Sequence, residues 1–395
     1  MSSKKGGLKL GIRNILFLGL VSFFIDLSTH MVYPLVPLYL VYVFGVSPAL
    51  IGLIEGASES AASLLKVFSG YTTDRFKKKK LIAFIGYVPA TIYKLMLFFS
   101  VSWVGIFAAK MIDRVGKGIR TSPRDVLISE STDKSQMGKS FGLHKALDML
   151  GVAMGILITF FVLLFMGEDP SSFRLIFLIA IVPSVLGLLM FFFIKEKKEA
   201  RQEKSKEPFW QNFKKIDGQL KLYLFVVFLF TLGNSSNVFI LLRAGTIGFS
   251  ASSVILLYFI YSMVASLLAM PMGKLSDRIG RKKLLVPGYI IFSICYLGFA
   301  FATQQWALVI VFVAYGAYTA MISGVERAYV AEIAPPELKG TMLGLQATVA
   351  GIALLPASVI AGIMWEAINP AAPFILGAGL SIIAALILII FMKNR

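Results

Sequence analysis

Long apolar stretches recur along the whole chain and are separated by short polar connections. A helix needs about 20 consecutive apolar residues to cross the hydrocarbon core of a membrane, and the sequence contains twelve such stretches. Because the connections leave no room for a soluble domain, we predict an all-α integral membrane protein. The predicted spans are residues 14–42, 49–70, 81–99, 103–125, 140–166, 173–194, 221–242, 252–273, 284–302, 305–331, 342–365 and 372–392.

The composition supports this class and excludes a soluble protein. Of the 395 residues, 57% are hydrophobic and only 15% are charged, whereas about 25% of the residues in a soluble protein are charged. So little polar surface cannot cover so large an apolar volume in water. The basic start of the chain precedes a span too long for a signal peptide, so we expect this span to be retained.

The chain has a formal net charge of +18, and its basic residues concentrate in alternate connections: 77–80, 134–139, 195–215 and 281–283. Cytoplasmic loops are rich in Lys and Arg. We therefore expect both termini in the cytoplasm and the protein in the cytoplasmic (inner) membrane of a bacterium. This placement explains the charge without a nucleic-acid partner. The charged residues of the opposite connections are Glu168, Asp169 and Glu366, with Arg174 and Arg243 as basic exceptions.

The two halves of the sequence repeat each other. The segment 70–75 matches 273–278 at an offset of 203, and four further positions match at an offset of 202. These four are Glu130, Gly138, Gly142 and Leu143, which match Glu332, Gly340, Gly344 and Leu345. Parallel six-span repeats place a substrate cavity between the halves at the membrane midplane. The predicted domains are an N-terminal six-helix bundle at 1–194, a cytoplasmic linker at 195–218 and a C-terminal six-helix bundle at 219–395.

The connection after the second span resembles the G-x-x-x-D-R-x-x-[RK]-[RK] motif of the major facilitator superfamily. The matching residues are Gly70, Asp74, Arg75, Lys78 and Lys79. A fuller copy follows the eighth span, with Gly273, Asp277, Arg278, Gly280, Arg281 and Lys282. The first copy has Lys77 where the second has Gly280. The resemblance implies the superfamily fold, two pseudo-symmetric bundles of six transmembrane helices each, working by alternating access.

An aspartate at the end of one helix can accept hydrogen bonds from the N-terminus of a neighbouring helix and pair with arginine. We therefore expect the two motif copies to form a cytoplasmic gate, the alternative being a plain topology anchor. The predicted gate residues are Gly70, Asp74, Arg75, Gly273, Asp277, Arg278, Gly280 and Arg281.

Ionisable side chains within spans are costly and by default mark pathways or coupling sites. Asp26 and His30 lie four residues apart, as do His144 and Asp148, so each pair shares a helix face on which the carboxylate can tune the imidazole. The predicted proton-coupling residues are Asp26, His30, Glu55, Glu59, Asp113, Arg114, His144, Asp148 and Glu326.

The fourth span is the most highly charged. Its segment Arg114-Val-Gly-Lys117-Gly118 resembles an R-x-x-Q-G element that the superfamily associates with proton transfer, with Lys117 in place of the glutamine. In the fifth span, Gly151 and Gly155 provide a small-residue face for close helix packing. The proline of the antiporter-type element is missing there, which weakens the case for drug efflux.

The basic side chains within spans favour an organic anion or a zwitterion as the transported solute. Tyr33, followed by two prolines, predicts a kinked first span lining the cavity. The polar run from Asn234 to Asn237 predicts a break in the seventh span, where side-chain amides can bind substrate. The predicted substrate-binding residues are Tyr33, Lys94, Lys110, Arg114, Lys145, Asn234, Asn237 and Arg327.

These features predict a proton-coupled secondary active transporter of a small organic solute. The alternative is a drug/proton antiporter that exports hydrophobic or cationic compounds, and sodium remains open as the coupling ion. The sequence has no nucleotide-binding, catalytic or metal-binding motif, and Cys295 is its one cysteine. We therefore expect neither an enzyme nor a cofactor, and a monomer whose partners are the solute, the proton and the lipid bilayer. A channel fits the two-fold repeat less well.

Overall fold

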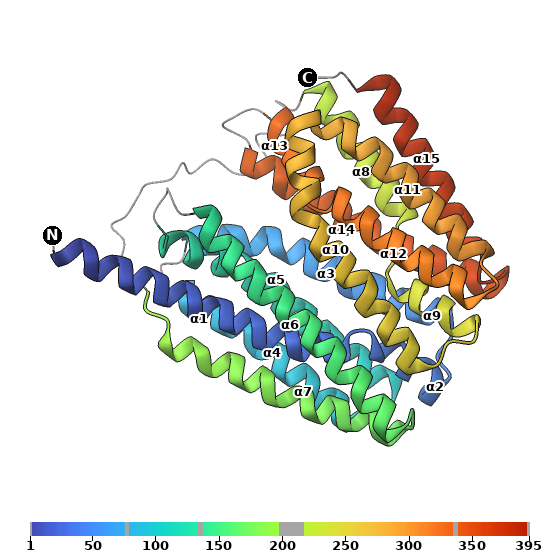
Figure 1. Ribbon diagram of the computed structural model, residues 1–395, viewed down its shortest axis with the longest axis horizontal. Coiled ribbons are helices and arrows are strands. Elements are labelled where there is room, and N and C mark those ends of the chain that lie inside the picture. Colours follow the sequence, from blue (N-terminus) through green and yellow to red (C-terminus); the bar gives the residue numbers. More distant parts are fainter. Residues whose placement is uncertain (1, 76–78, 133–136, 197–216, 335–338, 393–395) are drawn as a thin grey trace. The chain divides into compact units, whose positions relative to one another are not determined.

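The computed structural model describes residues 2–75, 79–132, 137–196, 217–334 and 339–392. Within these residues the chain forms 15 α-helices and one short 3-10 helix, and no strand (Figure 1). The helices group into two compact units, which we describe separately.

The first unit consists of residues Met1–Gly45, Ala61–Arg201 and Ala251–Leu256. It includes the C-terminal part of α3 (Pro48–Arg75) and the start of α10 (Ala251–Ile279). Its helices are α1 (Ser2–Val32), α2 (Leu35–Phe44), α3 (Pro48–Arg75, from Ala61), α4 (Lys79–Phe99), α5 (Trp103–Glu130), α6 (Met137–Met166), α7 (Pro170–Met190) and η2 (Phe191–Phe193).

The second unit consists of residues Val46–Ser60, Gln202–Ser250 and Leu257–Arg395. It includes the N-terminal part of α3 and most of α10. Its remaining helices are α8 (Gly218–Gly233), α9 (Val238–Thr246), α10 (Ala251–Ile279, from Leu257), α11 (Arg281–Phe301), α12 (Gln305–Ile322), α13 (Val325–Ile333), α14 (Lys339–Ala367) and α15 (Ala372–Phe391). The predicted linker 195–218 falls almost entirely outside the described residues, so the domain boundaries stay a prediction.

The predicted membrane-spanning helices are confirmed. Ten segments of the described chain are long and apolar enough to cross a membrane. The other two predicted spans correspond to α3 and α5, each 28 residues long. At 1.5 Å per residue such a helix extends about 42 Å, which exceeds the roughly 30 Å of the hydrocarbon core. These two helices carry more charged side chains than the other spans.

Three spans are interrupted rather than continuous. The first breaks at Tyr33 and Pro34, and the seventh breaks between Gly233 and Val238, as predicted. These two breaks occupy equivalent positions in the repeat. The tenth breaks between Ile322 and Val325, which the sequence analysis did not predict. A Ser-Gly pair stands there, but a single glycine in an apolar helical stretch is a weak signal for a break.

The predicted small-residue face of the fifth span packs against the first span. A Cβ atom on Gly151 of α6 would lie 2.3 Å from the carbonyl oxygen of Phe23 on α1. A Cβ atom on Gly155 would lie 2.2 Å from the carbonyl oxygen of Leu27. One helical turn further, the hydroxyl of Thr159 donates to the carbonyl oxygen of Met31 at 2.8 Å. The two backbones are therefore in direct contact over several turns.

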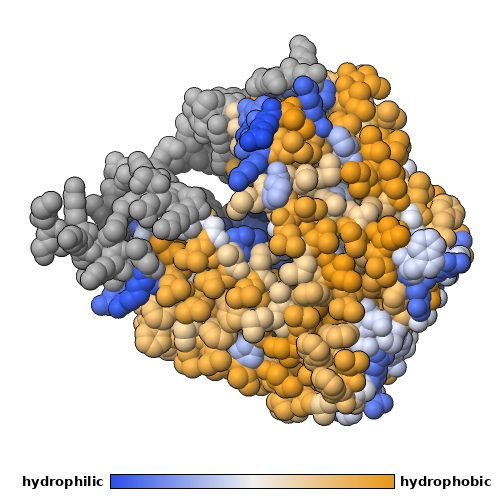
Figure 2. All heavy atoms as spheres, viewed as in Figure 1, coloured by the Kyte–Doolittle hydropathy of each residue, from blue (hydrophilic) through white to orange (hydrophobic). Residues whose placement is uncertain are grey.

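Large apolar side chains face outward along the helices. On the face shown in Figure 2, apolar residues cover most of the surface, and polar residues gather mainly near the ends of the helices. Phe165 is 80% exposed, Leu267 74% and Phe192 72%. Exposure on this scale is unfavourable in water and favourable against lipid chains.

The contact between α1 and α6 yields a test of the packing. Gly155→Ala should destabilise the protein by roughly 1–3 kcal/mol, because the new methyl group forces the two backbones apart. Gly142→Ala, on the same helix, meets no atom within 4 Å and should stabilise the helix by up to about 1 kcal/mol. Thermal unfolding in detergent measures both changes, and equal melting temperatures for the two variants would contradict this packing.

Candidate functional site

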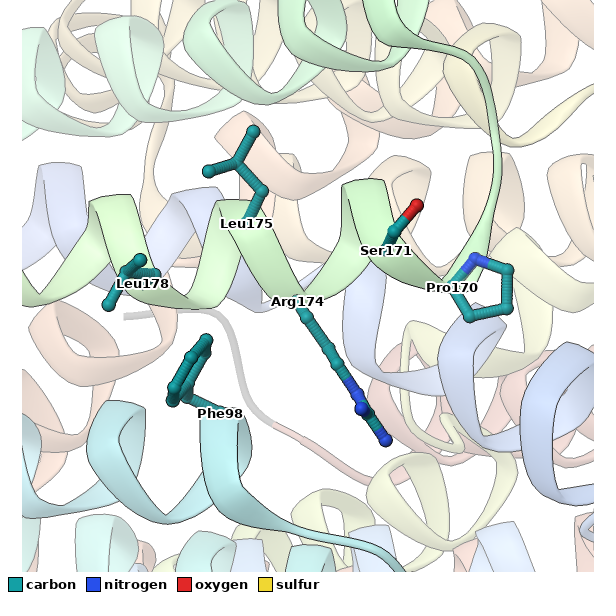
Figure 3. Close-up of a pocket in the computed structure, with 6 residues that line it drawn as sticks. All are labelled: Phe98, Pro170, Ser171, Arg174, Leu175 and Leu178. Atoms are coloured by element: carbon teal, nitrogen blue, oxygen red, sulfur yellow. The ribbon is translucent and has the colours of Figure 1, made fainter.

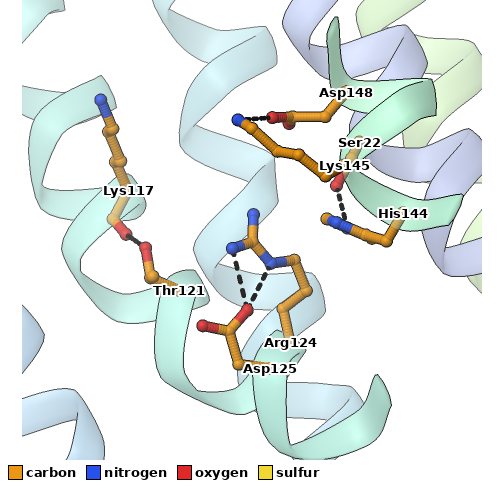
Figure 4. A network of polar contacts seen from close by, with 8 residues as sticks. All are labelled: Ser22, Lys117, Thr121, Arg124, Asp125, His144, Lys145 and Asp148. Atoms are coloured by element: carbon orange, nitrogen blue, oxygen red, sulfur yellow. Dashed lines mark hydrogen bonds and ion pairs between the residues drawn. The ribbon is translucent and has the colours of Figure 1, made fainter. Parts of the chain in front are cut away.

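In the first unit, two polar contacts one helical turn apart connect α1 and α6. The hydroxyl of Ser22 and Nε2 of His144 lie 2.8 Å apart. Four residues further along each helix, Asp26 and Asp148 interact as a pair across the same interface. Nζ of Lys145 also donates to Asp148, at 2.5 Å (Figure 4). Polar side chains thus interrupt the apolar interface between these helices.

The two predicted His/Asp pairs therefore face each other across the interface. The described contacts of Asp148 join it to Lys145 and Asp26, while His144 contacts Ser22. His30 lies beside Tyr33, with ring centroids 6.0 Å apart. The spacing predicted the shared faces, but which residues meet depends on the register of α1 against α6. The proton-coupling roles of these residues stay predictions.

A second cluster in the first unit surrounds Asp113 on α5. Its carboxylate lies between two guanidinium groups, 3.9 Å from Nη1 of Arg114 and 4.0 Å from Nη1 of Arg120. All three side chains are at most 7% exposed. Lys94 of α4, which is fully buried, also acts electrostatically on Asp113 and donates from Nζ to Thr29 Oγ1 at 3.2 Å. Three buried cations thus surround one buried carboxylate.

Tyr33, at the break between α1 and α2, lies next to two of the predicted substrate-binding cations. The guanidinium carbon of Arg114 is 5.7 Å from the centre of the Tyr33 ring, and Nζ of Lys110 is 6.0 Å from it. Both distances are within the range of cation–π attraction. The structure thus brings together three residues that the sequence analysis assigned to one site for different reasons.

In the second unit, the break in the seventh span supplies two amide side chains to a group of tyrosines. Nδ2 of Asn234 donates to the hydroxyl of Tyr318 at 3.1 Å, and Oδ1 of Asn234 accepts from the hydroxyl of Tyr296 at 3.3 Å. Oδ1 of Asn237 accepts from the hydroxyl of Tyr315 at 2.9 Å. The break therefore places polar groups from α11 and α12 around its own amides.

Two predicted carboxylates of the second unit bind neutral donors. Oε1 of Glu326, on α13, accepts from the hydroxyl of Tyr289 at 2.9 Å. Oε2 of Glu55, which is 1% exposed, accepts from the hydroxyl of Ser236 at 3.2 Å. Arg327 is exposed at the start of α13, and Glu59 is half-buried on α3.

The predicted gate residues lie at one end of each unit, where equivalent ion pairs stand. Lys79 pairs with Glu130 in the first unit. Nη1 of Arg281 pairs with Oε2 of Glu332 at 2.6 Å in the second. Both partners recur at the repeat offset of 202. Arg281 also contacts Asp277 at 3.4 Å, the Asp–Arg pair expected within the motif.

In each unit, the lysine that follows the basic residue of this ion pair binds the end of the last span. Nζ of Lys80 donates to the carbonyl oxygen of Ile194 at 2.6 Å, and Nζ of Lys282 donates to that of Met392 at 2.5 Å. Gly280 adopts a φ of +96°, a region that favours glycine. Gly273 and Arg278 belong to α10, and Gly70 belongs to α3. Lys77, Lys78 and the side chains of Asp74 and Arg75 lie outside the described residues.

The first unit also has a shallow cleft of about 470 Å³, which none of the cluster residues lines. Arg174 extends into it from α7 (Figure 3). Its Nε donates to the hydroxyl of Tyr39 at 3.3 Å. The residues lining it are Phe98, Pro170, Ser171, Arg174, Leu175 and Leu178. None of them was predicted as a site residue, and we assign the cleft no role.

Sequence reasoning missed the tyrosines of the second unit, because a tyrosine within an apolar span is typical of packing. One feature of the sequence could have indicated them, because Tyr315 and Tyr318 are three residues apart and share a helix face. The missed tyrosines are Tyr261, Tyr289, Tyr296, Tyr315 and Tyr318.

Among the described residues no group of three His, Cys, Asp or Glu side chains is placed to hold a metal ion.

Comparisons with known proteins identify relatives of this fold. The family model of the Major Facilitator Superfamily matches residues 18–242 and 223–395. The MFS-type transporter MJ1317 of Methanocaldococcus jannaschii is 38% identical over 383 residues, covering 95% of this chain and 94% of that protein. A crystal structure of a variant of the nucleoside transporter NupG has a TM-score of 0.83 at 14% identity, covering 96% of this chain and 100% of that one. A D-xylose–proton symporter has a TM-score of 0.74 at 16% identity, covering 97% and 98%.

The cluster around Asp113 makes a stability prediction. Asp113→Asn should destabilise the protein by roughly 3–5 kcal/mol, because it leaves buried guanidinium groups without a compensating charge. Asp125→Asn is the matched control on the same helix, since Asp125 pairs with Arg124 at 2.9 Å but is 48% exposed, and it should cost at most about 1 kcal/mol. Thermal unfolding compares the two variants, and similar losses would contradict a special role for the buried carboxylate.

Proposed function

This chain belongs to the major facilitator superfamily, and from that membership we propose that it is a proton-coupled transporter of a small organic solute, working by alternating access. The membership makes the protein a multi-pass membrane protein and a secondary transporter rather than an enzyme. What we propose beyond it is the coupling ion, the chemical class of the solute and the orientation in the membrane.

Proton coupling rests on the pairing of two carboxylates, Asp26 of α1 and Asp148 of α6, at a close helix contact. Two ionised carboxylates repel each other, and a proton bound between them replaces that repulsion with a hydrogen bond. The side chain of Asp148 is only 15% exposed, and the two groups exchange protons as a pair. A shared proton at the α1–α6 interface supports a role as the coupling site.

Lys145 provides the alternative partner for the same carboxylate. Its ammonium group lies 2.5 Å from Asp148 Oδ2 and its side chain is 63% exposed, so the lysine reaches water while Asp148 does so far less. When the shared proton leaves, the ammonium group stabilises the ionised Asp148, and when the proton returns, Asp148 binds Asp26 again. Because α1 and α6 are in backbone contact, this exchange acts directly on their packing.

The cations beside Tyr33 support an organic anion or a zwitterion as the solute. Arg114 and Lys110 bring two positive charges to one aromatic ring, and an incoming carboxylate or phosphate would bind these groups with charge-assisted hydrogen bonds. The alternative remains a drug/proton antiporter, which the buried carboxylates of both units permit. The two classes differ in whether binding depends on these cations.

The basic ends of the units support a cytoplasmic location for both termini. Lys79, Lys80, Arg281 and Lys282 begin the third and ninth spans, and basic residues at span ends face the cytoplasm. We propose the cytoplasmic membrane of a bacterium as the location.

Replacing the first aspartate tests the coupling. Asp26→Asn keeps the size of the side chain but removes the shared acidic proton, so accumulation driven by a pH gradient should be abolished while solute exchange at equal pH continues. Uptake is measured in proteoliposomes with a panel of a pentose, a nucleoside, a monocarboxylate, a dipeptide and a lipophilic cation. Asp125→Asn should behave as the wild type. Undiminished pH-driven accumulation by the Asp26 variant, or a current without saturation, would reject coupling at this site.

The class of solute is tested through the cations. Arg114→Ala and Lys110→Ala should abolish transport of the anionic or zwitterionic members of the panel, because the charge that attracts them is lost. Efflux of the lipophilic cation should persist in part. Lys221→Ala, at an exposed position on α8, is the control. Unchanged anion transport in both variants would favour the antiporter alternative.

A further inference from the structure

Glu168 binds the N-terminus of a helix that is far from it in sequence. It lies in the connection between α6 and α7, and its Oε2 accepts from the backbone N–H of Ala251 at 2.8 Å. Its Oε1 accepts from the N–H of Ser252 at 2.7 Å. These are the first two residues of α10, whose amides have no partner inside the helix. The carboxylate is therefore a bidentate cap on α10.

Glu366 makes the corresponding contact in the second unit. It is the penultimate residue of α14, and its Oε2 accepts from the backbone N–H of Ala49 at 3.4 Å. Ala49 is the second residue of α3, and Ser47 caps the next amide, that of Leu50, at 3.4 Å. A carboxylate near a helix N-terminus also gains from the positive end of the helix dipole.

The two caps are equivalent in the repeat. Ala49 and Ala251 are separated by the offset of 202 that relates the ion pairs of the gate. Each carboxylate lies near the end of the fifth span of its half, Glu168 just after α6 and Glu366 in the last turn of α14. The donors thus agree with the repeat, while the carboxylates are 198 residues apart and reach the equivalent amide from slightly different positions.

The capped helices are the two that change units along their length. Residues 251–256 of α10 belong to the first unit and the rest of that helix to the second, while α3 has its first residues in the second unit and the rest in the first. In each helix, the capping carboxylate holds in place the N-terminal segment, which lies in a different unit from the rest of the helix. For that segment to leave its unit, the carboxylate has to release the helix N-terminus.

We propose that Glu168 and Glu366 are positioning residues of the transport cycle. They hold the N-termini of α10 and α3 in one state of alternating access and release them in the other. The inference rests on the alternating access of the proposed function. Both carboxylates are exposed, so water replaces the released hydrogen bonds and the caps are reversible. Glu168 makes two short bonds and Glu366 one long one, so Glu168 contributes more.

The test measures the separation of two connections that are equivalent in the repeat. Spin labels are placed at Val101 and Thr303, exposed positions 202 residues apart, in a Cys295→Ala background. Electron–electron distance distributions are recorded for the full chain in proteoliposomes without added solute. Glu168→Ala should increase the ratio of the longer to the shorter separation by about threefold or more, as expected for the loss of a helix N-cap. Glu366→Ala should produce a smaller increase, and the double variant the largest.

Asp169→Ala is the matched control. Asp169 is the exposed neighbour of Glu168, and its side chain makes no capping hydrogen bond, so its distribution should coincide with that of the parent. If the distance distribution of the Glu168→Ala variant also coincides with that of the parent, the inference is overturned. Transport by the labelled parent is measured in the same vesicles. Failure of the parent to transport any of the panel rejects the proposed function, whereas transport by the parent without a shift in the Glu168 variant rejects only the caps.

Discussion

The absence of water from the hydrocarbon core governs this structure, because every buried charge and every interrupted helix has to find its partners within the protein. The cluster around Asp113 illustrates the first requirement. A single carboxylate among Lys94, Arg114 and Arg120 leaves a net positive charge inside the first unit. Burying these charges costs free energy even when they are paired, and charged groups within spans are by default candidates for a functional role.

The interrupted helices meet the second requirement in a different way. Where the seventh span breaks, the amides of Asn234 and Asn237 bind tyrosine hydroxyls from neighbouring helices. Where the first span breaks, Tyr33 lies against two cations. The halves thus share the position of the break but fill it with different chemistry, positive in one unit and neutral in the other.

Much of the fold could be predicted from the sequence, because the length of an apolar stretch and the placement of lysine and arginine reflect the membrane directly. The breaks at Tyr33 and at Asn234 were predictable for the same reason, since proline and consecutive polar residues stand out in an apolar span. The contacts within the site were not. The i, i+4 spacing places Asp26 and His30 on one face, but only the close packing of α6 on α1 determines that Asp26 meets Asp148. Likewise, Glu168 and Glu366 read as ordinary loop charges until the starts of α10 and α3 are located in space.

The shared membership of α3 and α10 bears on how such a chain can arise by duplication. Each unit contains a segment encoded in the other half of the sequence, Val46–Ser60 in one case and Ala251–Leu256 in the other. An ancestral half-length protein would have needed a second copy to complete its packing, with each subunit lending the start of its second helix to its partner. In this respect the present chain corresponds to a segment-swapped dimer whose two subunits have been joined by a linker.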